Sequence, residues 1–175
     1  MAIKVESPDI PHTTEAGVIG LGLADEPEVR AAYAKVMANA LKVAPASRIN
    51  GALVQPMVAP GVEIMVGARV DPLFGPLIVV SLGGVLVELF KDSVVSLAPV
   101  SAGAAREMLG RLKGAALLRG FRGSEPVDID GLALVVSRLS EFAADQSDRI
   151  AELDVNPLIC KGSRITAVDA LIVRK

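Results

Sequence analysis

Residues 151–158 have the sequence AELDVNPL, and residues 165–170 have the sequence ITAVDA. Both stretches are typical of short strands, and the turn-forming residues 161–163, KGS, lie between them. Asp154 and Asn156 are two positions apart, so a strand directs both side chains to one face of its sheet. The carboxyl-terminal part of the chain therefore predicts two paired strands with polar oxygen atoms on one face.

A metal site is one interpretation of these polar residues. Strand pairing can bring Asp169 beside Asp154 and Asn156, and carboxylate and amide oxygens are ligands that Mg²⁺ accepts, with water and phosphate oxygens completing its shell. The other interpretation is ordinary polar residues at strand ends. Because two carboxylates and an amide are costly to bury among apolar strands unless they share a cation or hydrogen bonds, we expect Asp154, Asn156 and Asp169 to bind magnesium.

The composition favours a compact protein with an aliphatic core. Of 175 residues, 51% are hydrophobic and 22% are charged. A net charge of -2 and an absence of Trp leave neither a basic surface nor many stacking platforms for nucleic acid. A single Cys excludes an internal disulfide. The longest apolar runs, such as residues 77–82, are too short to span a membrane, and no secretory signal is present, so we expect a cytoplasmic protein without membrane or nucleic-acid contacts.

The order of predicted elements is mixed. Strands are predicted over residues 2–6, 18–23, 52–57, 62–69, 77–82 and 85–91, and helices over residues 25–40, 101–112 and 130–144. Hairpin turns are expected at Pro60-Gly61 and at Gly83-Gly84. This order favours an α+β fold over a doubly wound sheet.

Three segments resemble the ATP-grasp domain of NDP-forming acyl-CoA synthetases, in the order and spacing of that family. They are residues 6–18 (ESPDIPHTTEAGV), residues 72–88 (PLFGPLIVVSLGGVLVE) and the Asp-x-Asn-Pro-Leu and Val-Asp-Ala segments within residues 154–170. The resemblance implies an α+β ATP-grasp fold with two lobes and mixed or antiparallel sheets, shortened at its amino terminus. Residues 1–50 would form part of the first lobe, with Lys4 and His12, and residues 51–175 the second lobe, with the metal site.

The resemblance also implies contacts to ATP or ADP. The residues so implied are Lys4, Gln55, Met57, Glu63, Gly83 and Gly84. Taken alone, Lys4 is equally an edge-strand lysine, Glu63 a solvated strand residue, and Gly83-Gly84 a plain hairpin turn. Arg122 lies in a further segment similar to the family, and its guanidinium could serve a phosphate or a buried carboxylate.

His12, the one histidine of the chain, is either a surface or capping residue or a nucleophile. The resemblance implies that it is a transient phosphoryl carrier, a role that suits imidazole. Thr13 follows it where the family usually has Lys, which removes a cation from beside a phosphorylated imidazole.

The implied function is nucleotide binding in an ADP-forming acyl-CoA synthetase, which couples acyl-CoA and acyl-phosphate interconversion to ATP through phosphohistidine. A CoA-binding or ligase domain or subunit would be the partner that handles acyl-CoA or acyl phosphate, and the chain alone is expected to be inactive in the full reaction. The alternative is a non-catalytic nucleotide-binding or regulatory module, as in ATP-grasp regions fused to protein acetyltransferases. We also expect a homo-oligomer, because the strand at residues 2–6 is predicted to have an unpaired edge.

Overall fold

The computed structural model describes residues 1–10, 17–84 and 92–175, which form two compact units, Met1–Met57 and Val58–Lys175. His12 and the strand predicted over residues 85–91 lie outside the described residues. The division falls one strand later than the boundary expected at residue 50, because β3 (Gly51–Gln55) pairs with β1 (Ala2–Glu6).

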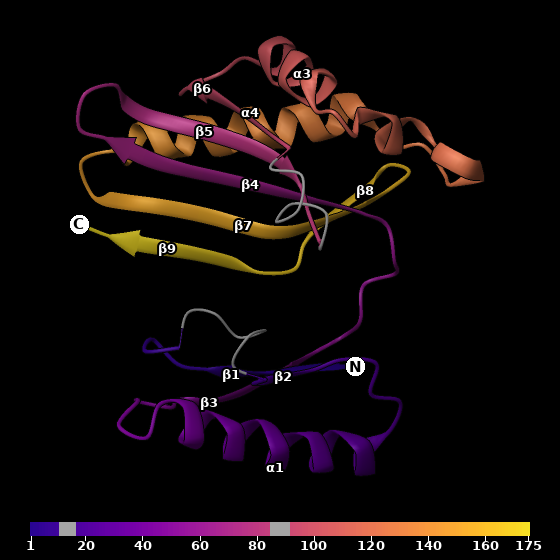
Figure 1. Ribbon diagram of the computed structural model, residues 1–175, viewed down its shortest axis with the longest axis vertical. Coiled ribbons are helices and arrows are strands. Elements are labelled where there is room, and N and C mark those ends of the chain that lie inside the picture. Colours follow the sequence, from indigo (N-terminus) through magenta and orange to yellow (C-terminus); the bar gives the residue numbers. More distant parts are fainter. Residues whose placement is uncertain (11–16, 85–91) are drawn as a thin grey trace. The chain divides into compact units, whose positions relative to one another are not determined.

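The first unit is a three-stranded antiparallel sheet with one helix against it (Figure 1). Its strand order is β2 (Ile19–Gly20), β1, β3, so β1 is paired on both edges. The unpaired edge expected at residues 2–6 is therefore wrong, and the self-association inferred from it loses its basis. Helix α1 (Glu26–Val43) begins after Asp25, whose side chain accepts the Glu28 N–H at 3.0 Å, as the capping signal predicts.

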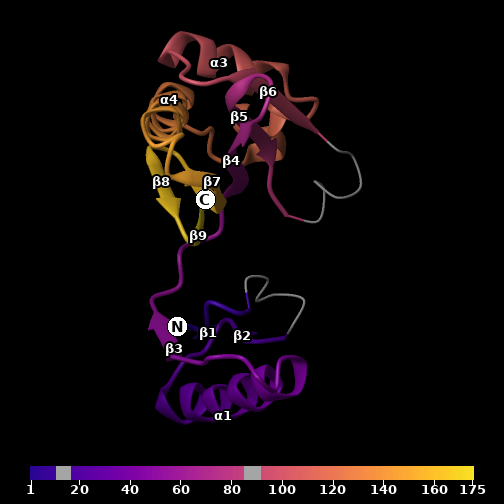
Figure 2. The same ribbon diagram turned by 90° about the vertical axis from the view of Figure 1, so that its left-hand side faces the viewer.

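The second unit is a six-stranded sheet with two helices on one face (Figures 1 and 2). Its strands are β4 (Val62–Asp71), β5 (Gly75–Leu82), β6 (Ser93–Leu97), β7 (Ile150–Lys161), β8 (Arg164–Ala167) and β9 (Ala170–Arg174). The order is β6-β5-β4-β7-β8, β9 also pairs with β7, and every pairing is antiparallel. The α+β class predicted from the sequence is confirmed.

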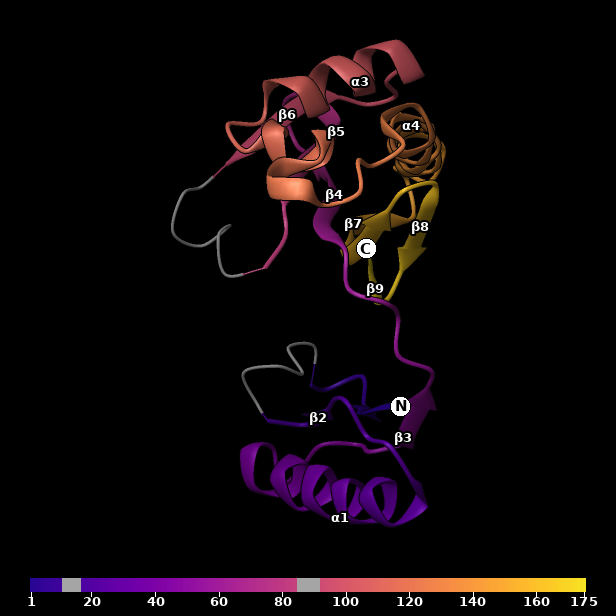
Figure 3. The same ribbon diagram turned by 90° about the vertical axis from the view of Figure 1, so that its right-hand side faces the viewer.

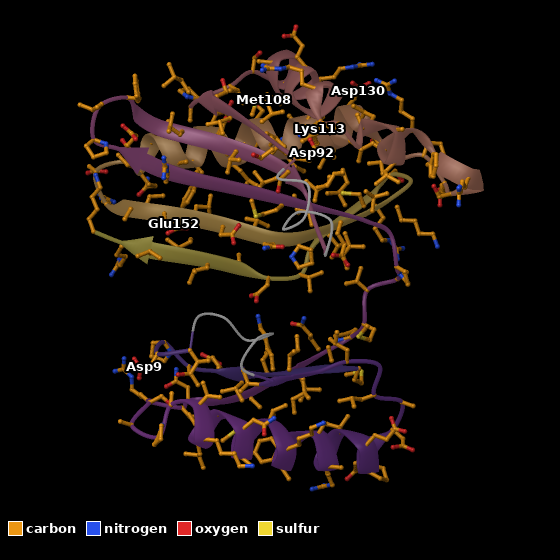
Figure 4. The ribbon with its side chains drawn as sticks, in the orientation of Figure 1. Asp9, Asp92, Met108, Lys113, Asp130 and Glu152 are labelled. Atoms are coloured by element: carbon orange, nitrogen blue, oxygen red, sulfur yellow. The ribbon has the colours of Figure 1, made fainter. Side chains whose placement is uncertain are left out.

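The helices of this unit are α3 (Ala102–Arg111) and α4 (Ile129–Asp145), joined by the short turns η1 (Ala115–Arg119) and η2 (Phe121–Gly123). The α3–η1 junction is fixed by Asp92, which lies beside Lys113 in Figure 4 and accepts the N–H groups of Lys113 and Gly114 at 2.7 and 2.9 Å. In the described part of the chain, no helix is both long and apolar enough to cross a membrane.

The hairpin expected about Pro60-Gly61 is wrong, because β3 and β4 belong to different sheets. Strand β4 turns instead into β5, and the Asp71 carboxylate accepts the N–H groups of Leu73 and Phe74 at 2.8 and 3.1 Å in that turn. These hydrogen bonds hold the pKa of Asp71 below its ordinary value. The apolar β4 is thus buried between β5 and β7 at the centre of the sheet.

Candidate functional site

Asp154 and Asn156 project from the face of the sheet that α3 and α4 do not cover. Their neighbours on β7, Leu153 and Val155, are buried in the core shared with these helices. Side chains alternate between the faces of a strand, so the polar pair lies on the opposite face. The pairing of β7 with β4 shifts register between Val155 and Leu158, so Asn156 lies within this irregularity whereas Asp154 lies in the regular ladder.

Asp169 lies across from Asn156, in the short connection between β8 and β9. Val155 pairs with Ala170, and one position further the Asn156 N–H donates to the Asp169 carbonyl at 3.1 Å. The Asp169 Oδ1 accepts the Ala170 N–H at 3.0 Å. This backbone hydrogen bond places Asp169 next to Asn156, so the three predicted ligands lie close together in the fold, at and beside β7.

The donor set of these three residues fits a hard divalent cation. Asp154 Oδ1 is buried, Asp169 is half-buried and Asn156 is exposed. Within residues 1–10, 17–84 and 92–175, no three His, Cys, Asp or Glu side chains gather into a metal site. A cation here would therefore use two carboxylates and one amide, and would take its remaining oxygen ligands from water and phosphate.

Gly67, on the adjacent strand β4, faces Asp154 directly. A Cβ atom at this position would lie 3.8 Å from Asp154 Oδ1 and 3.0 Å from Val79 Cγ1. Glycine inside a strand often marks the close approach of another group, and here it leaves room beside the carboxylate. Gly67 is not among the site residues predicted from the sequence, although a lone glycine in a strand is the signal that could have indicated it.

Three of the residues implied to contact nucleotide lie together, because the Gly83-Gly84 turn after β5 packs against Glu63 near the start of β4. The Gly83 N–H donates to the Glu63 carbonyl at 2.6 Å, and a Cβ on Gly83 would lie only 2.7 Å from Glu63 Cβ. Gly84 has a φ of +73°, and its Cβ would lie 3.2 Å from Glu63 Oε2. Both glycines are therefore needed for the end of β5 to cross the start of β4.

This turn borders a cavity of about 920 Å³ at the end of the sheet where β4 begins and β5 and β7 end. Its apolar wall includes Leu82, Leu117 and Phe121, and Glu63, Glu125 and Lys161 supply charges. The volume suits a nucleotide-sized ligand. The segment that carries Leu117 and Phe121 lies near β4 in Figure 3, and this non-local approach is why the sequence analysis missed both residues.

Cys160 also borders the cavity, and its thiol is buried. Desolvation raises the pKa of its thiol to about 11, so the group stays protonated at neutral pH. Gly61 packs against the same residue, since a Cβ there would lie 2.4 Å from the Cys160 carbonyl oxygen. Cys160 is therefore a small core residue.

Arg122 has a strained backbone. With φ 52° and ψ 38°, it is the one non-glycine residue at positive φ among those the structure describes. This conformation costs an L-residue about 1–2 kcal/mol. Its guanidinium lies 5.3 Å from the centre of the Phe121 ring, an exposed cation–π contact worth about 0.5–1 kcal/mol. The contact therefore does not fully offset the strain.

The remaining implied nucleotide contacts belong to the first unit. Lys4, on the central strand β1, faces Ile19 and Leu53 and is half-buried. Gln55 ends β3 on the same face of that sheet as Lys4, because Ala2 pairs with Gln55. Met57, at the end of the unit, is 48% exposed.

His12 lies outside the described residues, but the residues that precede and follow its segment are anchored. Asp9, labelled in Figure 4, accepts the Arg48 N–H at 2.7 Å, and Ile10 is buried in the core of the first unit. On the other side, the Asn39 side chain donates to the Gly17 carbonyl at 2.8 Å.

Comparison with known proteins gives one consistent family. A model of the ATP-grasp domain matches residues 1–173. The β subunit of ADP-forming acetate–CoA ligase II from Pyrococcus furiosus is 36% identical over 177 residues, which cover 100% of this chain and 75% of that subunit.

Solved structures agree over the same length. Acetyl-coenzyme A synthetase 1 of Candidatus Korarchaeum cryptofilum, solved with coenzyme A, Ca-AMPCP and HgCl⁺, has a TM-score of 0.93 and 39% identity, and the match covers 99% of this chain and 76% of that one. A second structure of that synthetase, with coenzyme A and Mg-AMPPCP, has its phosphohistidine segment pointing towards the nucleotide site; its TM-score is 0.82 at 36% identity, over 100% of this chain and 76% of that one. This chain therefore belongs to the ATP-grasp domain family, in the form carried by ADP-forming acyl-CoA synthetases.

Proposed function

We propose that this chain is the nucleotide-binding domain of an ADP-forming acyl-CoA synthetase and transfers a phosphoryl group reversibly between ATP and His12, with ADP as the other product or reactant. The observation that carries the proposal is that Asp154, Asn156 and Asp169 lie close together at β7. The neighbouring strand β4 carries Glu63 near its start, and Glu63 lines a cavity that suits a nucleotide. The relatives named above are ligases of this class. The two units would serve as part of the first lobe and as the second lobe of the domain.

Each implied residue takes one task in this proposal. A bound Mg²⁺ neutralises phosphate charge and orients the reacting phosphoryl group. Asp154, Asn156 and Asp169 supply oxygen ligands that hold the cation. Lys4 adds a positive charge for the phosphates. Gly84, which has a positive φ, lets its backbone approach the phosphates closely, whereas the Gly83 N–H is held by the Glu63 carbonyl. Gln55 and Met57, in the linker region, contact the adenine.

His12 accepts the phosphoryl group on an imidazole nitrogen, in the direction that consumes ATP, and returns it to ADP in the opposite direction. The chain contains no other histidine that could take this role. A separate CoA-binding domain or subunit would handle acyl-CoA and acyl phosphate. That division agrees with the name of the Pyrococcus furiosus relative as a β subunit.

A non-catalytic nucleotide-binding module is the second candidate, and Thr13 favours it. The family usually has Lys at this position, beside the histidine, and Thr cannot stabilise a phosphorylated imidazole by charge. A module of this kind would bind magnesium nucleotide but would not form phosphohistidine.

Calorimetric titration with ADP, in the presence of Mg²⁺ and in EDTA, tests the proposal. Wild-type protein should bind with a magnesium-dependent increase in affinity, and Asp169→Asn should abolish most of that increase because it removes a charge while keeping the side-chain shape. Glu141→Gln, on the exposed side of α4, is the matched control and should bind like wild type. Equal affinities in Mg²⁺ and EDTA for a folded wild-type sample would refute the metal site.

A further inference from the structure

We infer that Arg122 binds a phosphate group at the mouth of the cavity beside η2. This deepens the proposed function, because it assigns a phosphate contact that lies apart from the metal ligands. The first support is the backbone of Arg122, which is held in the left-handed region between Gly120 and Gly123, themselves at positive φ. Glycine or Asn would fit that conformation better, so the local fold alone gives no reason for a long cationic side chain.

The second support is position. Phe121, immediately before Arg122, and Ser124, two residues after it, both line the cavity of about 920 Å³. Residues on both sides of Arg122 thus form part of the cavity wall. The backbone conformation of Arg122 determines the direction in which its guanidinium extends from that wall. Non-glycine residues held at unfavourable φ and ψ occur preferentially at binding sites, where the strain is tolerated because it positions the side chain for the ligand.

The third support is charge. Residues 108–124 contain four cations, Arg111, Lys113, Arg119 and Arg122, and no acidic residue. The charged residues that line the cavity itself are Glu63, Glu125 and Lys161, so the guanidinium of Arg122 would add to a single lysine there. Among the residues that the structure describes, none forms an ion pair with Arg122, and its recorded contact is the Phe121 ring. A guanidinium presents a planar fork that matches phosphate oxygens in two parallel hydrogen bonds. The Arg122 guanidinium, which lies 5.3 Å from the ring of the cavity-lining Phe121, therefore suits phosphate by its donor geometry.

The phosphate could come from ADP, from coenzyme A or from inorganic phosphate, and titration can separate these sources. Arg122→Asn removes the guanidinium while keeping a residue that tolerates the left-handed conformation. In EDTA, this variant should bind at least one of the three compounds about 10-fold or more weakly, the loss expected for a charge-assisted hydrogen bond. Affinity for adenosine, which has no phosphate, should not change.

Two further variants make the result specific. Arg122→Lys retains the charge without the fork and should fall between wild type and Arg122→Asn. Arg138→Gln removes an exposed cation on α4, outside residues 108–124, and should match wild type. Urea unfolding should show Arg122→Asn to be at least as stable as wild type, because the substitution relieves strain.

The outcomes divide clearly. The inference is overturned if Arg122→Asn binds all three phosphate compounds as wild type does, if wild type binds none of them, if adenosine affinity falls equally, or if the variant is less stable. Work in EDTA keeps this test separate from the proposed metal site. If ADP binding does not depend on Mg²⁺ but Arg122→Asn still weakens phosphate binding, only the metal site is refuted. If ADP binding depends on Mg²⁺ but Arg122→Asn binds as wild type does, only the Arg122 contact is refuted.

Discussion

Gly67 and Asp154 face each other across β4 and β7, and a Cβ at position 67 would lie 3.8 Å from Asp154 Oδ1. The same Cβ would lie 3.0 Å from Val79 Cγ1 on the other neighbouring strand. A larger side chain therefore cannot extend there without displacing Val79 or the carboxylate. This relationship makes Gly67 a sensitive position for the proposed metal site, although glycine itself offers no ligand.

We expect Gly67→Val to weaken magnesium-dependent ADP binding by about 10-fold or more, because its methyl groups move Asp154 away from the cation. Overpacking should also cost about 1–3 kcal/mol of stability. Gly67→Ala should have the smaller effect on both quantities, since Val79 can yield slightly. Calorimetry and urea unfolding measure the two effects.

Gly110→Ala is the matched control, because a Cβ there meets no atom within 4 Å on helix α3. It should leave ADP affinity unchanged and raise stability by about 1 kcal/mol through helix propensity. Unchanged magnesium-dependent affinity in Gly67→Val would show that this gap does not serve Asp154.

Local signals account for what the sequence predicted well. Helices α1, α3 and α4 follow from capping residues and apolar spacing within each segment, and the adjacency of Asn156 to Asp169 follows from a strand, a turn and a second strand close in sequence. The ATP-grasp fold came from the resemblance and is confirmed by the family match.

Long-range pairing accounts for what the sequence did not predict. Strand β3 pairs with β1, about 50 residues earlier in the chain, although its nearest neighbour in sequence, β4, was the expected partner. The same reason explains why Gly67 and Phe121 were missed: each reaches the site through a contact between distant segments, which side-chain periodicity does not record.

Gly83→Ala should destabilise the second unit by about 1–3 kcal/mol. Its Cβ would lie 2.7 Å from Glu63 Cβ and 2.9 Å from the Glu63 carbonyl carbon, so backbone must move to admit it. Denaturant unfolding measures the loss, with Gly110→Ala again as the control. A variant as stable as wild type would mean that the turn relaxes freely, and its close packing against Glu63 would then be unimportant.

Ser140→Ala should cost about 1–3 kcal/mol, because it leaves a buried N–H without its acceptor. Ser140 Oγ accepts the Val100 N–H at 2.9 Å, and the neighbouring Ser137 Oγ donates to the Val100 carbonyl at 2.8 Å. Together they fix the connection from β6 to α3. Ser163→Ala, at an exposed turn position, should change stability by less than about 0.5 kcal/mol, and equal effects of the two substitutions would contradict the argument.

Cys160 provides a measure of opening near the cavity, since it is the one thiol of the chain. At pH 8, alkylation should be about 100-fold slower in native than in unfolded protein from the thiolate fraction alone, because burial raises its pKa from 9.0 to about 11. The folded-state pKa of Cys160 is above the unfolded value. The protonated thiol therefore makes its full contribution to the free energy of unfolding below pH 9.0, and this contribution is lost as pH rises towards about 11. Rapid native alkylation at pH 8 would show that the thiol is accessible.

His12→Ala should abolish phosphorylation of the chain by Mg-ATP while leaving the affinity for Mg-ADP near that of wild type. The physical reason is a division of tasks: the imidazole is the nucleophile that takes the phosphoryl group, whereas the proposed nucleotide contacts lie elsewhere in the sequence. Radiolabel from the γ-phosphate that is stable in base and released by acid identifies phosphohistidine, and the single histidine makes its assignment unambiguous. Label retained in His12→Ala would place the phosphoryl group on another residue. No label in wild type that nonetheless binds Mg-ADP would favour the non-catalytic module, and Thr13→Lys, which restores the cation of the family, would then be the variant to test for recovery of phosphorylation.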